Sequence, residues 1–508
     1  MKIKVKWINR QTQTILRDLG LLLHVPGVMA LVSIPVCLWF GEYYAISAFI
    51  WTALASLGIG QLLYRLCRNT SESARLRHAM LTVALGWGII PLLGSLPFWA
   101  IASKLSVSEL TPLTILNFQE PLNAIFESFS GFTSTGLSMA LRPSQLPYSL
   151  QWWRSFIEWI GGVGMIVLVL SVLEPSTNAY DLYYAEAREK KIALTVTGTV
   201  RKIWKIYLIY TVLGIILLRL VGMPWWEALN HGMTAIATGG FAITDDSIGA
   251  YNVGVQLAIA LMMIIGAISF SCHYQLLKKR RLSVLWQEPQ HRALWLLLLI
   301  GALLLAIENY WFSGSFLWVD SLFQWVSALA TCGFSTVKLQ YWSPSAKLLL
   351  SLAMIIGAAA GSTGGGIKLS RLVSLFKAVL WRFQRLALKP HQLMRYKLQG
   401  KVITESEASR QIEAAAVLLV LWITLLFIGV LVLLHVVLPQ YNLSDVILET
   451  SSALGSVGLS TGITHPDLHW LGKTILVLFM WMGRLEIIPV IVLFSALLRA
   501  LNTARANI

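Results

Sequence analysis

Charged residues are scarce in this 508-residue chain. Asp, Glu, Lys and Arg make up 13% of it, about half of the fraction that is typical of soluble domains, whereas 56% of the residues are hydrophobic. This balance excludes an ordinary soluble protein and indicates a polytopic membrane protein. Acidic residues are the scarcer kind, 24 against 40 basic ones. Because the basic residues fall mainly in loops between apolar segments, they indicate membrane topology rather than nucleic-acid binding.

The sequence also has few groups suited to covalent or metal chemistry. Its four cysteines are scattered, with no Cys-x-x-Cys motif and no disulfide framework. It has no His-Glu-x-x-His motif, its nine histidines are dispersed, and no spacing suggests a nucleophile beside a base. A membrane-embedded enzyme is therefore the weakest interpretation. The basic N-terminal stretch is too long and polar to begin a cleavable signal peptide, so we expect the first apolar segment to be a retained span.

A glycine-centred pentapeptide occurs four times in the chain. In each copy a hydroxyl residue stands two places before the glycine, and a bulky apolar residue follows it. The copies are Ser134-Thr135-Gly136-Leu137-Ser138, Thr238-Gly239-Gly240-Phe241-Ala242, Thr331-Cys332-Gly333-Phe334-Ser335 and Ser456-Val457-Gly458-Leu459-Ser460. One such peptide would carry no information, since glycine and serine are common in membrane helices, but four with matching flanks indicate an internal repeat.

A polar residue lies thirteen positions before each of these glycines. The four are Asn123, Glu227, Asp320 and Asp445. The apolar segment between the polar residue and the glycine is too short to cross a bilayer, which takes about 20 residues. We therefore expect four half-length helices, each capped by its polar residue and each followed by irregular backbone.

Irregular backbone at membrane depth is tolerated only where it is buried in protein or lines a watery path. Four such strands around one axis would present rings of carbonyl oxygens, which can replace the hydration shell of a potassium ion. The repeat therefore predicts a pore with a selectivity filter. The predicted filter residues are Ser134, Thr135, Gly136, Thr238, Gly239, Gly240, Thr331, Cys332, Gly333, Ser456, Val457 and Gly458.

Apolar segments of span length flank each predicted filter segment. We expect two leading spans near 21–40 and 44–63, followed by span pairs near 78–102 and 152–173, 206–221 and 253–272, 294–312 and 346–369, and 414–438 and 471–498. The predicted fold is an all-α polytopic membrane protein with ten transmembrane helices, in which four units of span, re-entrant loop and span surround one pore. The two-helix N-terminal region is expected over 1–77. The four pore repeats are expected over 78–190, 191–280, 281–408 and 409–508, and the third includes the glycine-rich run.

Lysine and arginine residues cluster in alternate loops. By the positive-inside rule this pattern places both termini in the cytoplasm and opens all four filter segments toward the outside. The longest basic loop, about 372–409, has two interpretations. It contributes to topology and contacts anionic lipid headgroups, or it is a docking surface for a cytosolic partner.

A run of small residues interrupts the expected second span of the third repeat. It reads Gly357-Ala358-Ala359-Ala360-Gly361-Ser362-Thr363-Gly364-Gly365-Gly366-Ile367-Lys368. A nucleotide-binding loop is disfavoured, because Ile367 separates the glycines from the lysine and no strand precedes them. Close helix packing through small residues is an alternative. We prefer a flexible loop below the filter that acts as a gate.

Three further sets of polar residues lie within apolar segments. Arg484 is an intramembrane charge, and so a functional candidate; we expect it beside the glycine loop, where it would raise the barrier to ions, or alternatively paired with Glu486 or another buried carboxylate. Arg154 and Glu158 are expected to form a structural pair on one helix face. One repeat position is expected to pack behind the filter, and it holds Glu127, His231, Gln324 and Glu449.

These motifs resemble those of the Trk/Ktr/HKT superfamily of potassium transport proteins, in particular the bacterial TrkH/TrkG type. The resemblance covers nearly the whole chain. It rests on the four filter glycines, the glycine-rich run, and the segments Trp159-Ile160-Gly161-Gly162-Val163-Gly164-Met165 and Gly483-Arg484-Leu485-Glu486. The chain departs from the family pattern at Ala242, which replaces the usual hydroxyl, and at Leu137 and Leu459, where aromatic residues can occur.

The resemblance implies a homodimer in the bacterial inner membrane with one pore per subunit. It further implies K+ held at the filter residues, gating by the glycine loop with Arg484, and regulation by a cytosolic nucleotide-binding subunit of the TrkA type. In plant relatives a serine at the first filter position goes with sodium permeation, so Gly136 favours potassium.

Potassium uptake down the electrochemical gradient is the leading hypothesis. An inside-negative potential favours inward movement of a cation by about 2.3 kcal/mol per 100 mV. The alternatives are a K+/Na+ or K+/H+ symporter, since broken helices also suit alternating access, and a less selective monovalent cation channel. The fourfold pattern favours one central path over paired inverted halves. No covalent cofactor is expected.

Overall fold

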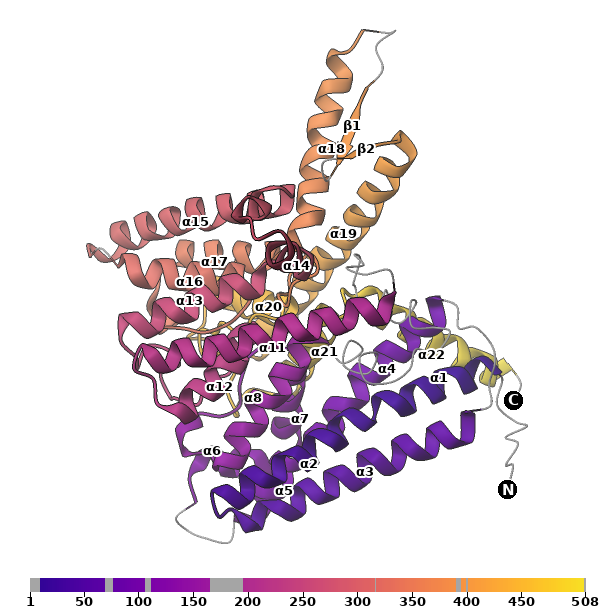
Figure 1. Ribbon diagram of the computed structural model, residues 1–508, viewed down its shortest axis with the longest axis vertical. Helices are drawn as coiled ribbons and strands as arrows, with labels where there is room; N and C mark the ends of the chain where they lie inside the picture. The colour runs from indigo at the N-terminus through magenta and orange to yellow at the C-terminus, as the bar shows by residue number, and fades with distance from the viewer. Residues whose placement is uncertain are drawn as a thin grey trace.

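A computed structural model describes residues 10–68, 76–105, 111–164, 195–315, 317–389, 394–398 and 401–506. The chain is mostly helical, as predicted (Figure 1). Within the described residues the only strands are β1 (Tyr396–Leu398) and β2 (Lys401–Ile403), which pair antiparallel. They join two helices that project from the rest of the molecule, α18 and α19 (Figure 1).

The N-terminal region lies beside the pore repeats and contains α1 (Arg10–Leu22), α2 (His24–Trp39) and α3 (Tyr43–Cys67). The first two helices follow each other as one apolar stretch long enough to cross a membrane, and α3 packs along both (Figure 1). The helices approach closely where Gly20 faces α3, because a Cβ there would lie 2.7 Å from the carbonyl oxygen of Gly60. The first helix thus begins well before the span that was predicted to start at residue 21.

The first span and the pore helix of each repeat are separate helices. The first spans are α4 (Leu76–Gly94) with α5 (Leu96–Leu105), α11 (Val196–Leu220), α15 (Pro289–Ser313) and α19 (Glu405–Val436). The pore helices are α7 (Pro121–Phe132), α12 (Trp225–Ile236), α16 (Trp318–Leu329) and α20 (Leu443–Gly455). Short connecting helices are α6 (Leu113–Leu116), η1 (Asn117–Gln119), η2 (Pro143–Gln145), η3 (Leu282–Trp286) and η4 (Leu339–Tyr341).

The second span is broken in the last three repeats. The helices are α8 (Tyr148–Val163), α13 (Val253–Ala267) with α14 (Phe270–Lys279), α17 (Pro344–Ile356) with α18 (Leu369–Ala387), and α21 (Trp470–Arg484) with α22 (Ile488–Ala506). The prediction of continuous spans over 253–272 and 471–498 was wrong, since α13 and α14 meet at 100° and α21 and α22 at 116°.

Each bend has a local cause. The Ser269 side chain accepts the Cys272 N–H and so starts α14 in a new direction, and two residues with positive φ, Glu486 and Ile487, end α21. The predicted span over 152–173 is helical to Val163, and residues 165–173 lie outside the described part of the chain.

Ten spans are not confirmed. Six helices of the described residues are long and apolar enough to cross a membrane, and up to eight if each bent pair counts as one span. The α8 and α17 helices are too short to pass that test alone.

The N-cap of each pore helix lies three residues before the polar residue that was predicted to cap it. The observed N-cap residues are Glu120, Pro224, Leu317 and Asn442. The predicted caps Asn123, Glu227, Asp320 and Asp445 are therefore third helical residues, and their assignment as caps was wrong. In α20 the Asp445 carboxylate accepts the Asn442 backbone N–H, and the Asn442 side chain accepts in return, so the two form a capping box.

Candidate functional site

The chain reverses in the same way after each pore helix. The hydroxyl residue two places before the filter glycine adopts a left-handed backbone: Ser134 (φ 51°), Thr238 (51°), Thr331 (55°) and Ser456 (52°). The glycine also has positive φ: Gly136 (91°), Gly240 (86°), Gly333 (91°) and Gly458 (103°). Left-handed backbone costs a residue with a Cβ about 1–2 kcal/mol, so the same unfavourable step taken four times indicates that the surrounding structure requires it.

The four strands surround one axis. A Cβ added to any filter glycine would overlap the carbonyl oxygen of the residue that precedes the next glycine. The pairs are Gly136 with Gly239 (2.1 Å), Gly240 with Cys332 (2.2 Å), Gly333 with Val457 (2.1 Å) and Gly458 with Thr135 (2.2 Å). The first strand touches the second, the second the third, the third the fourth, and the fourth the first. The contacts therefore close into a ring that involves eight of the twelve predicted filter residues.

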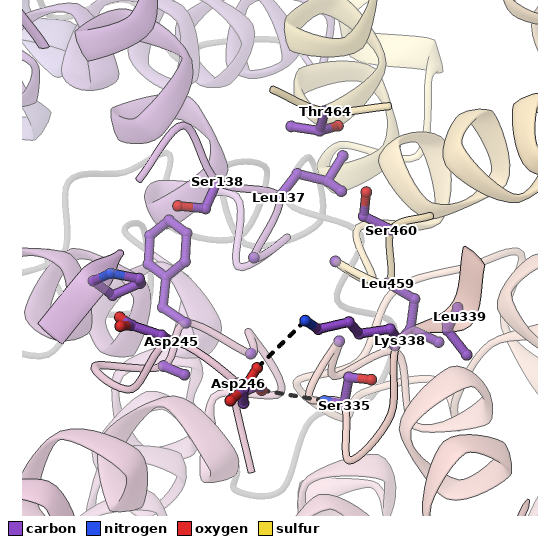
Figure 2. A pocket seen from close by; sticks show the side chains of 18 of the residues that line it. Leu137, Ser138, Asp245, Asp246, Ser335, Lys338, Leu339, Leu459, Ser460 and Thr464 are labelled. Atoms are coloured by element: carbon purple, nitrogen blue, oxygen red, sulfur yellow. Dashed lines mark hydrogen bonds and ion pairs between the residues drawn. The ribbon is translucent and has the colours of Figure 1, made fainter. Parts of the chain in front are cut away.

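A cavity of about 690 Å³ opens at the glycine end of this ring. Figure 2 shows side chains from all four repeats around it, among them Ser138, Asp246, Lys338 and Ser460. The Lys338 ammonium lies 3.9 Å from the Asp246 carboxylate, and both side chains are mostly exposed. The cavity therefore borders the ring at this end.

The glycine-rich run lies at the opposite end of the strands, as the non-helical segment between α17 and α18. The Gly365 N–H donates to Thr331 Oγ1 at 2.6 Å in the third repeat. The Gly366 N–H donates to the carbonyl oxygen of Gly455, the last residue of α20, at 3.0 Å. Thr363 accepts from the Thr238 hydroxyl at 3.2 Å. The loop therefore contacts the filter ends of three repeats.

The glycines of this loop allow backbone contacts that a side chain would block. Gly357, Gly361 and Gly366 have positive φ. A Cβ on Gly365 would lie 2.1 Å from the carbonyl oxygen of Gly455. The remaining predicted gate residues, Ser362, Thr363 and Gly364, lie in the same segment. Of the seven, Thr363, Gly364 and Gly365 are in direct contact with residues of the filter strands.

Arg484 is the last residue of α21 and lies beside the glycine-rich loop. Its guanidinium donates to the carbonyl oxygens of Gly162 at 2.9 Å and Thr363 at 3.3 Å, and also to that of Gly161. Gly161 packs against the end of the first pore helix, since a Cβ on it would lie 2.0 Å from Phe132 O. The alternative partner, Glu486, binds Arg371 instead. Arg484 therefore links the glycine loop to the first repeat.

Arg154 and Glu158 do not pair with each other, so that prediction was wrong. Arg154 binds Glu127 at 2.7 Å, and both side chains are buried. Its guanidinium also donates to the carbonyl oxygen of Ala242 at 2.8 Å, while Glu158 accepts the Phe241 N–H at 3.0 Å. Sequence spacing could not reveal these partners, because Glu127 lies on another helix of the first repeat and Phe241 and Ala242 lie in the second repeat. Two charges within an apolar segment had already indicated buried polar contacts.

The residues predicted to pack behind the filter do lie there. Glu127, His231, Gln324 and Glu449 are each fully buried. They project from the four pore helices toward the strands that return after each filter glycine, and three of them form hydrogen bonds there.

A second buried ion pair joins the third and fourth repeats. The Lys347 ammonium, on α17, lies 2.7 Å from the Asp445 carboxylate in the first turn of α20, and the two side chains are 3% and 6% exposed. Lys347 also donates to the carbonyl oxygen of Gln340. The pair fixes the N-terminal end of α20 to α17.

Replacing Lys347 by methionine should lower stability by about 3–5 kcal/mol, because it leaves the Asp445 carboxylate buried without its cation. A double variant, Lys347→Met with Asp445→Asn, should recover much of this loss, since it removes both charges. Thermal unfolding of the purified proteins in detergent measures the difference. Equal midpoints for the single and the double variant would contradict the expectation.

Comparison with known proteins places the chain in a family. The family model TrkH, described as cation transport protein, matches residues 45–502. An uncharacterized cation transporter of Methanocaldococcus jannaschii is 31% identical, over 96% of this chain and 96% of that protein. The Trk system potassium uptake protein TrkH of Halomonas elongata is 31% identical, over 95% of this chain and 98% of that protein.

A solved structure agrees with this result. The crystal structure of the potassium transporter TrkH from Vibrio parahaemolyticus is similar with a TM-score of 0.78 at 26% identity, over 95% of this chain and 98% of that chain. Because the family model matches most of the chain and relatives above 30% identity cover nearly all of it, the chain belongs to the TrkH family of cation transport proteins.

Proposed function

We propose that this protein takes up potassium as the membrane subunit of a Trk-type system. The closed ring of contacts among the four filter strands is the observation that carries the proposal. Four strands around one axis present carbonyl oxygens to a single path, and such rings can replace the hydration shell of K+. Relatives named as potassium uptake proteins cover nearly the full chain, which supports potassium as the ion.

The glycine loop and Arg484 are proposed to form the gate of this path. They contact all four repeats at the end of the filter opposite the cavity. A loop held by backbone hydrogen bonds and one guanidinium can be released without unfolding a helix. A cation beneath the filter would also repel a permeating ion while the loop is in place.

The surroundings of the pore are proposed as the sequence pattern and the family resemblance predicted them. The protein would form a homodimer in a bacterial inner membrane, with both termini in the cytoplasm and the regions 1–77, 78–190, 191–280, 281–408 and 409–508 as its units. A cytosolic nucleotide-binding subunit would regulate it. The projecting hairpin of α18, β1, β2 and α19 offers such a subunit an exposed surface, with basic side chains such as Arg382 and Arg385 (Figure 1).

Rubidium uptake into proteoliposomes tests the proposal. The purified chain is reconstituted, an inside-negative potential is imposed, and sodium is added as competitor. We expect potential-driven uptake that excess sodium barely inhibits. Uptake only under a sodium or proton gradient would establish a symporter, and uptake that sodium blocks would establish a less selective channel. If the parent protein is silent, the measurement is repeated with the cytosolic subunit, and continued silence would refute the proposal.

A further inference from the structure

Three of the four filter strands are tied to their own pore helix by a side-chain hydrogen bond. The helix residue lies nine places before the filter glycine, and the hydroxyl lies two places after it. The pairs are Glu127 with Ser138 (2.9 Å), Gln324 with Ser335 (2.8 Å) and Glu449 with Ser460 (2.8 Å). We call this the intra-repeat bond. It fixes the strand at the point where it leaves the filter.

The second strand has no such bond. The residues in the two equivalent places are His231 and Ala242, and alanine has no hydroxyl. His231 contacts the carbonyl oxygen of Glu227 through Nδ1, and among the described residues its buried Nε2 has no hydrogen-bond partner. The strand 238–242 must therefore be held in another way.

Two buried charges on α8, in the first repeat, hold it. Arg154 donates to the carbonyl oxygen of Ala242 at 2.8 Å, and its guanidinium lies 4.2 Å from the centre of the Phe241 ring. Glu158 accepts the Phe241 N–H at 3.0 Å. Arg154 and Glu158 are 1% and 0% exposed. The backbone N–H of Phe241 and the carbonyl oxygen of Ala242, the two residues after the filter glycine, are thus bound by side chains from a different repeat.

The local sequence of the second strand fits this arrangement. Glycine stands at 239, where the other strands have Thr135, Cys332 and Val457. A Cβ on Gly239 would lie 2.2 Å from the Glu158 carboxylate carbon. The missing side chain makes room for the carboxylate.

No other second-span helix of the described structure carries these charges. Arg154 is the seventh and Glu158 the eleventh residue of α8. The seventh residues of α13, α17 and α21 are Ile259, Leu350 and Leu476. The eleventh residues are Met263, Met354 and Met480. Charge at both places occurs only on α8, which binds the strand that lacks the intra-repeat bond and, through Arg154 and Ser138, also contacts the first strand.

We infer that Arg154 and Glu158 are positioning residues that set the ion preference of the filter by holding its second strand in place of the intra-repeat bond. The inference rests on the proposed function of the ring as a potassium filter. The placement and number of carbonyl oxygens decide whether K+ is preferred over Na+. A strand freed at Phe241 and Ala242 can move its carbonyls toward the smaller ion.

The test measures rubidium uptake with sodium competition in proteoliposomes. Arg154→Gln is combined with Glu127→Gln so that Glu127 is not left as a buried carboxylate without its ion-pair partner. In this double variant we expect the preference for rubidium over sodium to fall about tenfold. This is the effect of losing one hydrogen bond to a charged group. The matched control is the neutralised ion pair Lys347→Met with Asp445→Asn, which touches no filter strand and should keep the parental preference.

Rescue separates positioning from general stability. Adding His231→Gln and Ala242→Ser to the double variant gives the second repeat the Gln–Ser pair of the third, and should restore most of the preference. A variant that is less stable but keeps the geometry of the filter would show less uptake, while its preference for rubidium over sodium would stay unchanged. If the double variant fails to elute as a folded protein, Glu158→Met, which copies the residue of the other three helices, replaces it with the same expected loss.

The outcomes distinguish this inference from the proposed function. A parent protein that prefers rubidium, with variants that prefer it equally, would overturn the inference alone. A parent protein without any such preference would overturn the proposed function and the inference with it.

Discussion

Replacing Gly333 by serine should lower the preference for rubidium over sodium by about a hundredfold. A Cβ at this position would lie 2.1 Å from the carbonyl oxygen of Val457, so the third and fourth strands must separate. Overpacking of this kind costs about 1–3 kcal/mol, and positive φ at a residue with a Cβ costs about 1–2 kcal/mol more. Rubidium uptake with sodium competition measures the change.

Gly41 provides the matched control for this substitution. It lies in the turn between α2 and α3 with φ of 70°, and nothing lies within 4 Å of a Cβ placed there. Gly41→Ser therefore has the backbone strain without the overlap, and should keep the parental preference. If both variants changed the preference equally, or neither did, contact within the ring would not be the cause.

Replacing Arg484 by glutamine should raise rubidium uptake in the absence of any cytosolic subunit by about tenfold or more. The guanidinium joins the carbonyl oxygens of Gly161 and Gly162 to that of Thr363 in the loop. A hydrogen bond to a charged group contributes about 1.5–3 kcal/mol, so its loss shifts the population toward the released loop. Removing the charge also lowers the electrostatic barrier to a cation that passes the glycine loop.

Arg484→Lys is the control for charge. Lysine keeps the positive charge but lacks the planar fork that binds several carbonyls at once. Its uptake should lie between those of the parent and the glutamine variant. A glutamine variant that folds and yet transports no faster than the parent would show that Arg484 does not hold the path closed.

The local pattern of the sequence located the elements on which the pore depends. Short helices followed by non-helical backbone occur where the repeated glycine pentapeptides predicted them. Both signals are local, because a glycine affects only the backbone near it and the length of an apolar segment can be counted directly in the sequence. The break between α17 and α18 was evident from the sequence for a similar local reason, because clustered glycines disfavour a helix. The roles of the filter and gate residues stay predictions until uptake is measured.

The predicted starts of the pore helices were wrong, because neighbouring residues compete for the N-cap position. Asn123, Glu227, Asp320 and Asp445 are suitable caps by type, but the N-cap of each helix lies three residues earlier, at Glu120, Pro224, Leu317 and Asn442. Hydropathy also predicted two second spans as single straight helices. It could not show that they bend, because the bends depend on the side-chain cap of Ser269 and on the positive φ of Glu486, which composition does not reveal.

Composition and repetition by themselves determined that this is a helical membrane protein built of four related units. Only the tertiary structure decided how those units hold one another. Arg154, Glu158 and Arg484 bind groups from other repeats, because a buried charge is stable only beside whichever polar groups the fold brings to it. The closure of the four strands into a ring is likewise a property of their packing, and no single repeat contains it.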